Sequence, residues 1–309
     1  MKTLASFALL LAVLSPVASA GVQPLERTDA GHAAVRVQLD GHAPQRFIVD
    51  TGASTTAVYG PARRSLALSP EPGAQAQLVG VGGAQAIERY RLPALTVAGV
   101  RVDGVLATGL PDGVAHGDGL AGILGRDVFG DRVVEFDFAA GRFGLHAPGT
   151  VPATRTGWTV LPIRLLPDAG FVLLDVQVDG RPVTAVLDTG ARHSYVNWHA
   201  ARQAGLAPGA AGLARGASSG GATAHRIEFD TAAFRKVEAG AVAFEAPRLR
   251  VADLPVFEPM GLADGPGLIL GLDLLGDRRI VVDYPGRRLL VEARVAAPAA
   301  GNPAGPGAP

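Results

Sequence analysis

The stretch FIVDTGAST (residues 47–55) ends an apolar run with Asp-Thr-Gly, and AVLDTGARH (residues 185–193) does the same further along the chain. Each stretch lies in a longer repeated unit. VRVQLDGHAPQRFIVDTGAS (35–54) and LLDVQVDGRPVTAVLDTGAR (173–192) both alternate apolar and polar residues on either side of an Asp-Gly pair. An Asp-Gly pair between two alternating runs predicts a β-hairpin. The chain therefore contains two similar predicted hairpins, each followed by Asp-Thr-Gly.

The repeat extends beyond the hairpins. ILGRDVFGDRVVEFDFAAGRFGL (123–145) corresponds to ILGLDLLGDRRIVVDYPGRRLLV (269–291). Between hairpin and Ile-Leu-Gly, each copy carries a Gly-rich stretch, LVGVGG (78–83) in the first and RGASSGG (215–221) in the second. A repeat of this length indicates a duplicated structural unit.

We expect the two copies to form two homologous β-rich lobes, at about 31–148 and 156–293. The linker between them (147–157) is rich in Pro, Gly and Thr, as a connection between lobes should be. The 41 glycines and 23 prolines favour many short strands and turns. Short helices are expected in four places: 61–68, 126–130, 198–206 and 272–276.

The composition excludes several classes of partner. Acidic and basic residues number 28 each, so the formal net charge is zero and gives no general attraction to nucleic acid or anionic lipid. Aromatic residues make up only 6% of the chain, too few for platforms on which bases stack. We therefore expect no nucleic-acid partner. Since there is no Cys, there is no disulfide, and stability must come from the cores.

The first twenty residues have the pattern of a secretory signal peptide. Lys2 precedes the apolar run LASFALLLAVL (4–14), and Ala18-Ser19-Ala20 forms a small-residue cleavage site. The run is too short to span a bilayer, so an uncleaved anchor is the weaker alternative. We expect a mature chain that begins at Gly21, is periplasmic or secreted, and leaves the membrane. The Pro/Ala/Gly-rich tail (296–309) is predicted to be disordered.

A single Asp-Thr-Gly is adequately explained as a turn after a strand. Two copies at equivalent places require more, because an unpaired carboxylate at the end of an apolar strand is costly. The natural partner of Asp50 is Asp188, across an axis that relates the two lobes.

Together these motifs resemble the retropepsin-like aspartic proteases, in the bacterial, single-chain form with two gag-polyprotein-type aspartyl protease domains. The residues that carry the resemblance are VDTGAS (49–54), LDTGA (187–191), ILGRD (123–127) and ILG (269–271). The resemblance implies an all-β fold of two pepsin- or retropepsin-like β-barrel lobes, related by a pseudo-two-fold axis, with few short helices.

The resemblance also implies a mechanism. Asp50 and Asp188 share one proton and hold a water between them. The ionised carboxylate acts as general base on the water, and the protonated one donates to the oxygen of the scissile carbonyl. No metal or other cofactor is required. The residues implied to support this pair are Thr51, Gly52, Ser54, Gly125, Thr189, Gly190 and Gly271.

Two Gly-rich turns are candidate flaps that fold over substrate and exclude water. Their tips are Gly80, Val81, Gly82 and Gly83 in the first copy, and Ser218, Ser219 and Gly220 in the second. For the second turn, an ordinary hairpin without substrate contact is an equal alternative.

Ala53 and Ala191 follow the two motifs where pepsin-type enzymes usually carry Ser or Thr. A hydroxyl that donates to the carboxylate would lower its pKa, and its loss leaves the pKa higher. The sequence therefore predicts an activity optimum between mildly acidic and neutral pH.

The copies also differ from each other. Ser54 becomes Arg192, and Arg126 becomes Leu272. If Arg192 points at the carboxylates, it depresses the pKa of Asp188. If it points outward, it pairs with an acid such as Asp273. The outward orientation is favoured, because Arg is seldom buried without a partner.

Two other patterns are weaker. The loop that carries Asp112, His116 and Asp118 matches no well-defined metal site. His193 and Ser194 are adjacent and point to opposite faces of an extended chain, so they are poorly placed for proton transfer.

The sequence therefore predicts an exported aspartic endopeptidase, active as a monomer on a peptide or protein substrate bound in extended form. The alternative is a protease-like module that binds peptide without effective cleavage, and Arg192 keeps this alternative open.

Overall fold

The computed structural model describes residues 21–80, 82–112, 119–152, 155–220 and 226–293. The expected signal peptide and the Pro/Ala/Gly tail lie outside the described residues. So do Val81 at the first predicted flap tip, and His116 and Asp118 of the acidic loop. Among the described residues, no helix is long and apolar enough to cross a membrane.

The first lobe is built around a ten-stranded sheet that contains the first predicted hairpin. In this hairpin β3 (Ala33–Leu39) and β4 (Gln45–Val49) are antiparallel, with Val35 opposite Phe47. The sheet order is β6-β7-β10-β5-β11-β4-β3-β8-β9, with β2 beside β3. The remaining strands are β2 (Glu26–Arg27), β5 (Ala57–Val58), β6 (Pro70–Gly80), β7 (Gly83–Arg91), β8 (Leu95–Val97), β9 (Val100–Val102), β10 (Leu106–Gly109) and β11 (Leu120–Leu124).

The second lobe repeats this sheet. Its hairpin consists of β16 (Val172–Val178) and β17 (Arg181–Leu187). The order β19-β20-β23-β18-β24-β17-β16-β21-β22, with β15 beside β16, matches the first sheet strand for strand. The remaining strands are β15 (Arg164–Leu165), β18 (Tyr195–Val196), β19 (Ala214–Gly220), β20 (Arg226–Ala233), β21 (Lys236–Ala239), β22 (Val242–Glu245), β23 (Arg248–Val251) and β24 (Gly267–Leu270). The predicted fold class, an all-β chain of two similar lobes, is confirmed.

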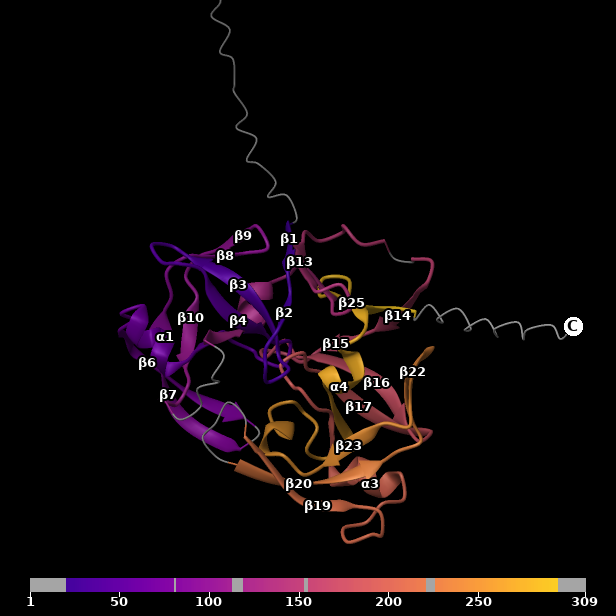
Figure 1. Cartoon of the computed structure of the whole chain (residues 1–309). Helices are drawn as coiled ribbons and strands as arrows, with labels where there is room; N and C mark the ends of the chain where they lie inside the picture. The colour runs from indigo at the N-terminus through magenta and orange to yellow at the C-terminus, as the bar shows by residue number, and fades with distance from the viewer. Residues whose placement is uncertain (1–20, 81, 113–118, 153–154, 221–225, 294–309) are drawn as a thin grey trace, which may run out of the picture.

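A third sheet joins the lobes, and the sequence did not indicate it. Its order is β1-β13-β12-β25-β26-β14, and it lies at the top of Figure 1. At its centre β12 of the first lobe pairs antiparallel with β25 of the second, from Val133 opposite Asp283 to Asp137 opposite Arg279. The strands are β1 (Gly21–Pro24), β12 (Val133–Asp137), β13 (Arg142–His146), β14 (Trp158–Pro162), β25 (Arg279–Asp283) and β26 (Arg288–Glu292).

The four expected helices are present and short. They are α1 (Gly60–Ser65), α2 (Arg126–Phe129), α3 (Trp198–Gln203) and α4 (Leu272–Leu275), and the 3-10 turn η2 (Pro255–Phe257) follows β23. Pro61 occupies the first turn of α1, where its missing N–H removes no helical hydrogen bond. Asn197 begins α3, and its side chain accepts a hydrogen bond from the Ala200 N–H at 2.9 Å.

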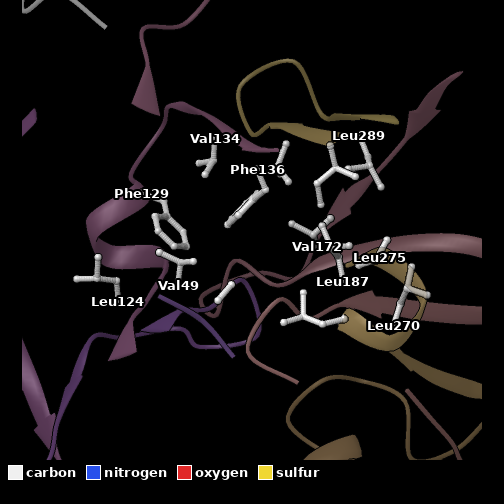
Figure 2. Packing of buried hydrophobic residues seen from close by; sticks show 14 of the residues in the cluster. Val49, Leu124, Phe129, Val134, Phe136, Val172, Leu187, Leu270, Leu275 and Leu289 are labelled. Atoms are coloured by element: carbon white, nitrogen blue, oxygen red, sulfur yellow. The ribbon is translucent and has the colours of Figure 1, made fainter. Parts of the chain in front are cut away.

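The core runs continuously from one lobe into the other (Figure 2). Val49, Leu124 and Phe129 in the first lobe occupy the positions that Leu187, Leu270 and Leu275 occupy in the second, and all six are at most 2% exposed. Burial of each such side chain contributes about 1.5–3 kcal/mol. The buried side chains therefore hold in place the strands that end at the two Asp-Thr-Gly motifs.

Candidate active site

Each Asp-Thr-Gly motif begins where a buried strand ends. β4 is parallel to β11, and the Asp50 N–H donates to the Leu124 carbonyl at 3.0 Å. In the second lobe β17 is parallel to β24, and the Asp188 N–H donates to the Leu270 carbonyl at 3.0 Å. In each lobe, the strand before the motif thus pairs with the strand that contains Ile-Leu-Gly. Together the two strands fix the backbone position of the aspartate.

The two threonines hold the motifs together across the lobe interface. Thr51 Oγ1 accepts from the Thr189 N–H and donates to the Leu187 carbonyl. Thr189 Oγ1 accepts from the Thr51 N–H and donates to the Val49 carbonyl. The four distances lie between 2.7 and 3.1 Å, and both side chains are fully buried. This reciprocal set fixes the separation of the two aspartates.

The glycines of the motifs bring each backbone against the opposite carboxyl group. A Cβ on Gly52 would lie 2.6 Å from Cγ of Asp188, and a Cβ on Gly190 would overlap Asp50 in the same way. The Gly52 N–H donates to Asp50 Oδ1 at 2.7 Å. Asp50 and Asp188 are therefore held side by side, which is the arrangement expected from the sequence. We call them the dyad.

Gly125 and Gly271 lie directly beneath the two loops. A Cβ on Gly125 would lie 2.6 Å from the Thr55 carbonyl carbon, and a Cβ on Gly271 would lie 2.8 Å from the Ala191 oxygen. Only glycine permits these close approaches. The strand that precedes each glycine therefore passes immediately under its Asp loop.

A hydroxyl–carboxylate pair supports each loop, and the sequence analysis missed it. Thr56 donates through its N–H and its hydroxyl to Asp127 Oδ1, both at 2.8 Å. In the second lobe the Ser194 hydroxyl donates to Asp273 Oδ1 at 2.6 Å and accepts from the Gly271 N–H. The signal was available, because Thr56 and Ser194 are 138 residues apart, like the two motifs.

These two hydroxyl–carboxylate pairs show that two expectations from the sequence were wrong. Ser54 was expected to support the dyad, but it is exposed at the cleft, and the supporting hydroxyl belongs to Thr56. Asp273 was expected to pair with Arg192, but its carboxylate accepts from Ser194. Arg192 points instead to the N-terminal segment, where its Nη1 donates to the Ala30 carbonyl at 2.9 Å.

The difference between Arg126 and Leu272 also has a structural explanation. Arg126 donates to the Gly130 carbonyl and stacks 4.3 Å above the Tyr284 ring. At the equivalent place in the second lobe, the Gly276 carbonyl accepts from Arg27, at 2.6 Å. The arginine missing from the second repeat is thus supplied by the segment that precedes the first.

Burial is the main influence on the dyad's acidity. It raises the pKa of Asp50 well above the usual range, the neighbouring Asp188 raises it further, and the N–H groups of Gly52 and Gly190 oppose both effects. Burial also raises the pKa of Asp188, but N–H groups and the Asp50 side chain stabilise its ionised form. The Ala191 N–H donates to Asp188 Oδ1 at 2.8 Å. The pKa of Asp50 is therefore raised more strongly, and the ionised form is better stabilised at Asp188.

The dyad lies at the floor of a cavity of about 360 Å³ between the lobes. The first lobe contributes apolar and mostly uncharged polar side chains, with His32 from its N-terminal part, and the second lobe contributes apolar and basic side chains. Sequence reasoning did not find most of these residues, because they come from strands and loops far from the motifs. The lining residues include Thr55, Thr108, Arg192, His193, Tyr195 and Arg250.

Only one of the two flap candidates is seen to reach the cavity. Gln77, Leu78, Val79 and Gly80, at the end of β6, line it, and Gly80 pairs with Gly83 across the turn. The hairpin of β6 and β7 also contacts η2 of the second lobe. In the second hairpin Ser218 is exposed and does not line the cavity, while Ser219 and Gly220 pair with β20.

The described residues of the acidic loop and of the His193-Ser194 pair have structural contacts. Asp112 forms an ion pair with Arg63 at 2.9 Å. Among the described residues, no group of three or more His, Cys, Asp or Glu side chains is placed to hold a metal ion. Ser194 belongs to the support described above and not to a Ser-His pair.

A comparison with protein families agrees with this geometry. The model of the family described as aspartyl protease matches residues 35–128 and 174–274, one region in each lobe. A search of curated proteins found no match.

Proposed function

Because the chain belongs to the aspartyl protease family, we propose that it is an aspartic endopeptidase, which hydrolyses peptide bonds with a water held between Asp50 and Asp188. The observation that supports this proposal most strongly is the dyad itself. Two carboxyl groups from equivalent loops lie side by side, and the reciprocal threonine hydrogen bonds fix their separation.

The two carboxyl groups have different tasks at the start of the reaction. Ionised Asp188 accepts a proton from the water, whose oxygen then attacks the scissile carbonyl carbon. Protonated Asp50 donates its proton to the carbonyl oxygen, so that no full negative charge develops there. Asp188 then donates the proton that it took from the water to the departing amine nitrogen, and the C–N bond breaks. Asp50 takes back a proton from a hydroxyl of the tetrahedral intermediate, so the dyad again holds one proton. No covalent intermediate with the protein is formed.

The walls of the cleft suit an extended peptide. The end of β6 lines the same cavity as the dyad, where a strand-like substrate could pair with the backbone of the hairpin. Closure of this hairpin toward η2 would exclude water and strengthen the electrostatic interactions beneath it. Since both lobes belong to one chain, we propose that the active form is a monomer, exported after removal of residues 1–20.

Peptide binding without cleavage is the rival function, and Arg192 was the reason to consider it. The guanidinium donates to the Ala30 carbonyl beside the cleft. The pKa of Asp188 is raised, not depressed as a cation against the carboxylate would make it. This geometry favours the enzyme.

The test is cleavage of a mixed peptide library by the chain that begins at Gly21, followed by mass spectrometry from pH 3 to 8. We expect cleavage by the wild-type protein and a loss of about 10²–10⁴-fold in Asp50→Asn and Asp188→Asn. Asp264→Asn, at an exposed site outside the cavity, is the matched control and should retain activity. Absence of cleavage by folded wild-type protein at every pH would favour the peptide-binding module.

A further inference from the structure

The two lobes carry different charges at equivalent positions of the cleft wall. Three places that hold hydroxyl side chains in the first lobe hold basic side chains in the second, and all six residues line the cavity. The pairs are Ser54 and Arg192, Thr55 and His193, and Thr108 and Arg250.

The first two pairs follow from the sequence, since each is separated by the same 138 residues as the motifs. The third follows from strand register. Thr108 of β10 lies opposite Ala57 of β5, and Arg250 of β23 lies opposite Tyr195 of β18, both in parallel pairs. The strands β5 and β18 are equivalent, so Arg250 occupies the place of Thr108.

In the first lobe the side chains at these positions are neutral. The hydroxyl groups of Thr55 and Thr108 form a hydrogen bond with each other, at 3.2 Å. In the second lobe Arg250 is half-buried, and aromatic rings fix its orientation. Its Nη1 donates to Tyr195 Oη at 2.6 Å, and its Cζ lies 4.2 Å from the centre of the Phe229 ring.

Among the described lining residues, few acids face the basic side chains of the second lobe. Among the described residues that line the cavity, the dyad supplies the only carboxyl groups. Asp273 is the nearest acid to His193, at 3.9 Å, and its oxygens already accept from Ser194. Burial is the first cause that lowers the pKa of His193; Arg250 and Arg192 lower it further, and Asp273 opposes them.

We propose that the substrate carries an Asp or Glu side chain on the side of the scissile bond that lies on the second lobe, and that Arg250 binds it with Arg192 nearby. This inference rests on the proposed function, because it assigns a preference to the same cleft. A guanidinium carries five N–H donors in a planar fork that matches a carboxylate. Among the described residues, Arg250 and Arg192 each use one donor in a hydrogen bond, to Tyr195 and to Ala30.

We expect the contact between Arg250 and a substrate carboxylate to contribute more binding free energy than an exposed surface ion pair. A half-buried guanidinium held by aromatic rings loses little freedom when a carboxylate binds. Charged hydrogen bonds in a partly dry cleft are strong, and we expect a preference of about tenfold or more for Glu over Gln at one substrate position. The first lobe offers hydroxyls at the equivalent place, so no such preference is expected on the other side of the scissile bond.

The experiment uses a peptide set in which each position near the scissile bond carries Glu or Gln in turn. The ratio of kcat/KM for the Glu and Gln peptides is measured with wild-type protein and with Arg250→Gln. Arg248→Gln is the matched control, since Arg248 is on the same strand but is exposed and does not line the cavity. Binding of the same peptides is measured separately with Asp50→Asn, which retains the basic wall.

We expect the ratio to reach about ten or more at one position in wild type and in Arg248→Gln, and to fall close to one in Arg250→Gln. If Arg250→Gln does not fold, Arg250→Lys replaces it, and a reduced but remaining preference is expected. Equal ratios at every position, or equal binding of Glu and Gln peptides to Asp50→Asn, would overturn the inference. Preferential binding of Glu peptides without any cleavage would support it while contradicting the proposed endopeptidase.

Discussion

At the scale of single residues, the two aspartates share the sequence Asp-Thr-Gly-Ala but not the same environment. The Ala191 N–H donates to the Asp188 carboxylate at 2.8 Å. In the first loop the Ala53 N–H is instead 3.5 Å from the Asp50 backbone carbonyl. This difference leaves Asp50 with less stabilisation of its ionised form, in agreement with the stronger rise of its pKa.

The pH profile of activity follows from the directions of these shifts. The reaction needs Asp188 ionised and Asp50 protonated, so the rate falls on the acid side with the pKa of Asp188 and on the alkaline side with that of Asp50. Both pKa values are raised, Asp50 the more strongly. We expect a bell-shaped profile of kcat/KM with its maximum between mildly acidic and neutral pH. The measurement is initial rates on one peptide, and a maximum well below pH 4 would contradict it.

The failures of sequence reasoning at this scale have a common cause. The Asp-Thr-Gly motifs and their glycines were predictable, because close backbone contacts demand those residue types. The tasks of Ser54 and Arg192 were not, because a side chain's partner comes from distant parts of the chain. Arg192 contacts the carbonyl of Ala30, which is 162 residues away in sequence.

At the scale of elements, the two Asp loops behave as one unit because each threonine spans the interface. Thr51→Val keeps the shape of the side chain but removes the hydroxyl, which leaves the Thr189 N–H and the Leu187 carbonyl without their buried partner. We expect the free energy of unfolding to fall by about 1–3 kcal/mol. Activity should fall as well, because the separation of the carboxyl groups is no longer fixed.

The control is Thr51→Ser, which retains the hydroxyl and should keep most of both properties. Denaturant unfolding gives the stability of the variants, and peptide cleavage gives their activity. A loss in the Ser variant with little or none in the Val variant would show that the methyl group, not the hydrogen bonds, is important.

The elements themselves were largely predictable from sequence. Alternation around Asp-Gly located both hairpins, and short helical patterns located the four helices. The roles of the two Gly-rich stretches were not predictable, since they look alike in sequence, while among the described residues only those of the first line the cavity. Which hairpin reaches the dyad depends on contacts with the opposite lobe, such as those with η2.

At the scale of the whole molecule, the lobes are joined by a shared sheet as well as by a linker. The repeat predicted two lobes, but it carries no information on pairing between them. The pairing of β12 with β25 brings together segments about 146 residues apart that occupy equivalent places in the repeat. The N-terminal strand β1 extends the same sheet, and Arg27 of the following β2 completes the second lobe.

Glu135 is the principal charged contact across this joint. Its Oε1 accepts from Nε of Arg279 in the other lobe at 2.6 Å, and its Oε2 lies 2.9 Å from Nε2 of His146. These contacts, His146 first and then Arg279, outweigh burial and lower the pKa of Glu135 from 4.5 to about 2. A lowered pKa in the folded state means that ionised Glu135 stabilises the fold above about pH 4.5 and that this contribution is lost as the pH falls toward 2.

Glu135→Gln should therefore lower the free energy of unfolding at pH 7 by about 2 kcal/mol. This is below the full linkage of about 3 kcal/mol for the shift from 4.5 to about 2, because Arg279 also lies 3.7 Å from Asp137 and keeps that acid nearby. Calorimetry at a series of pH values is the measurement, and the difference from wild type should narrow as the pH falls below about 4.5. Glu71→Gln is the control, since its pair with Arg91 lies on the surface of one lobe and should matter little. A loss in Glu135→Gln that stays constant down to pH 3 would instead assign the effect to packing, and the joint would then depend on its backbone pairing alone.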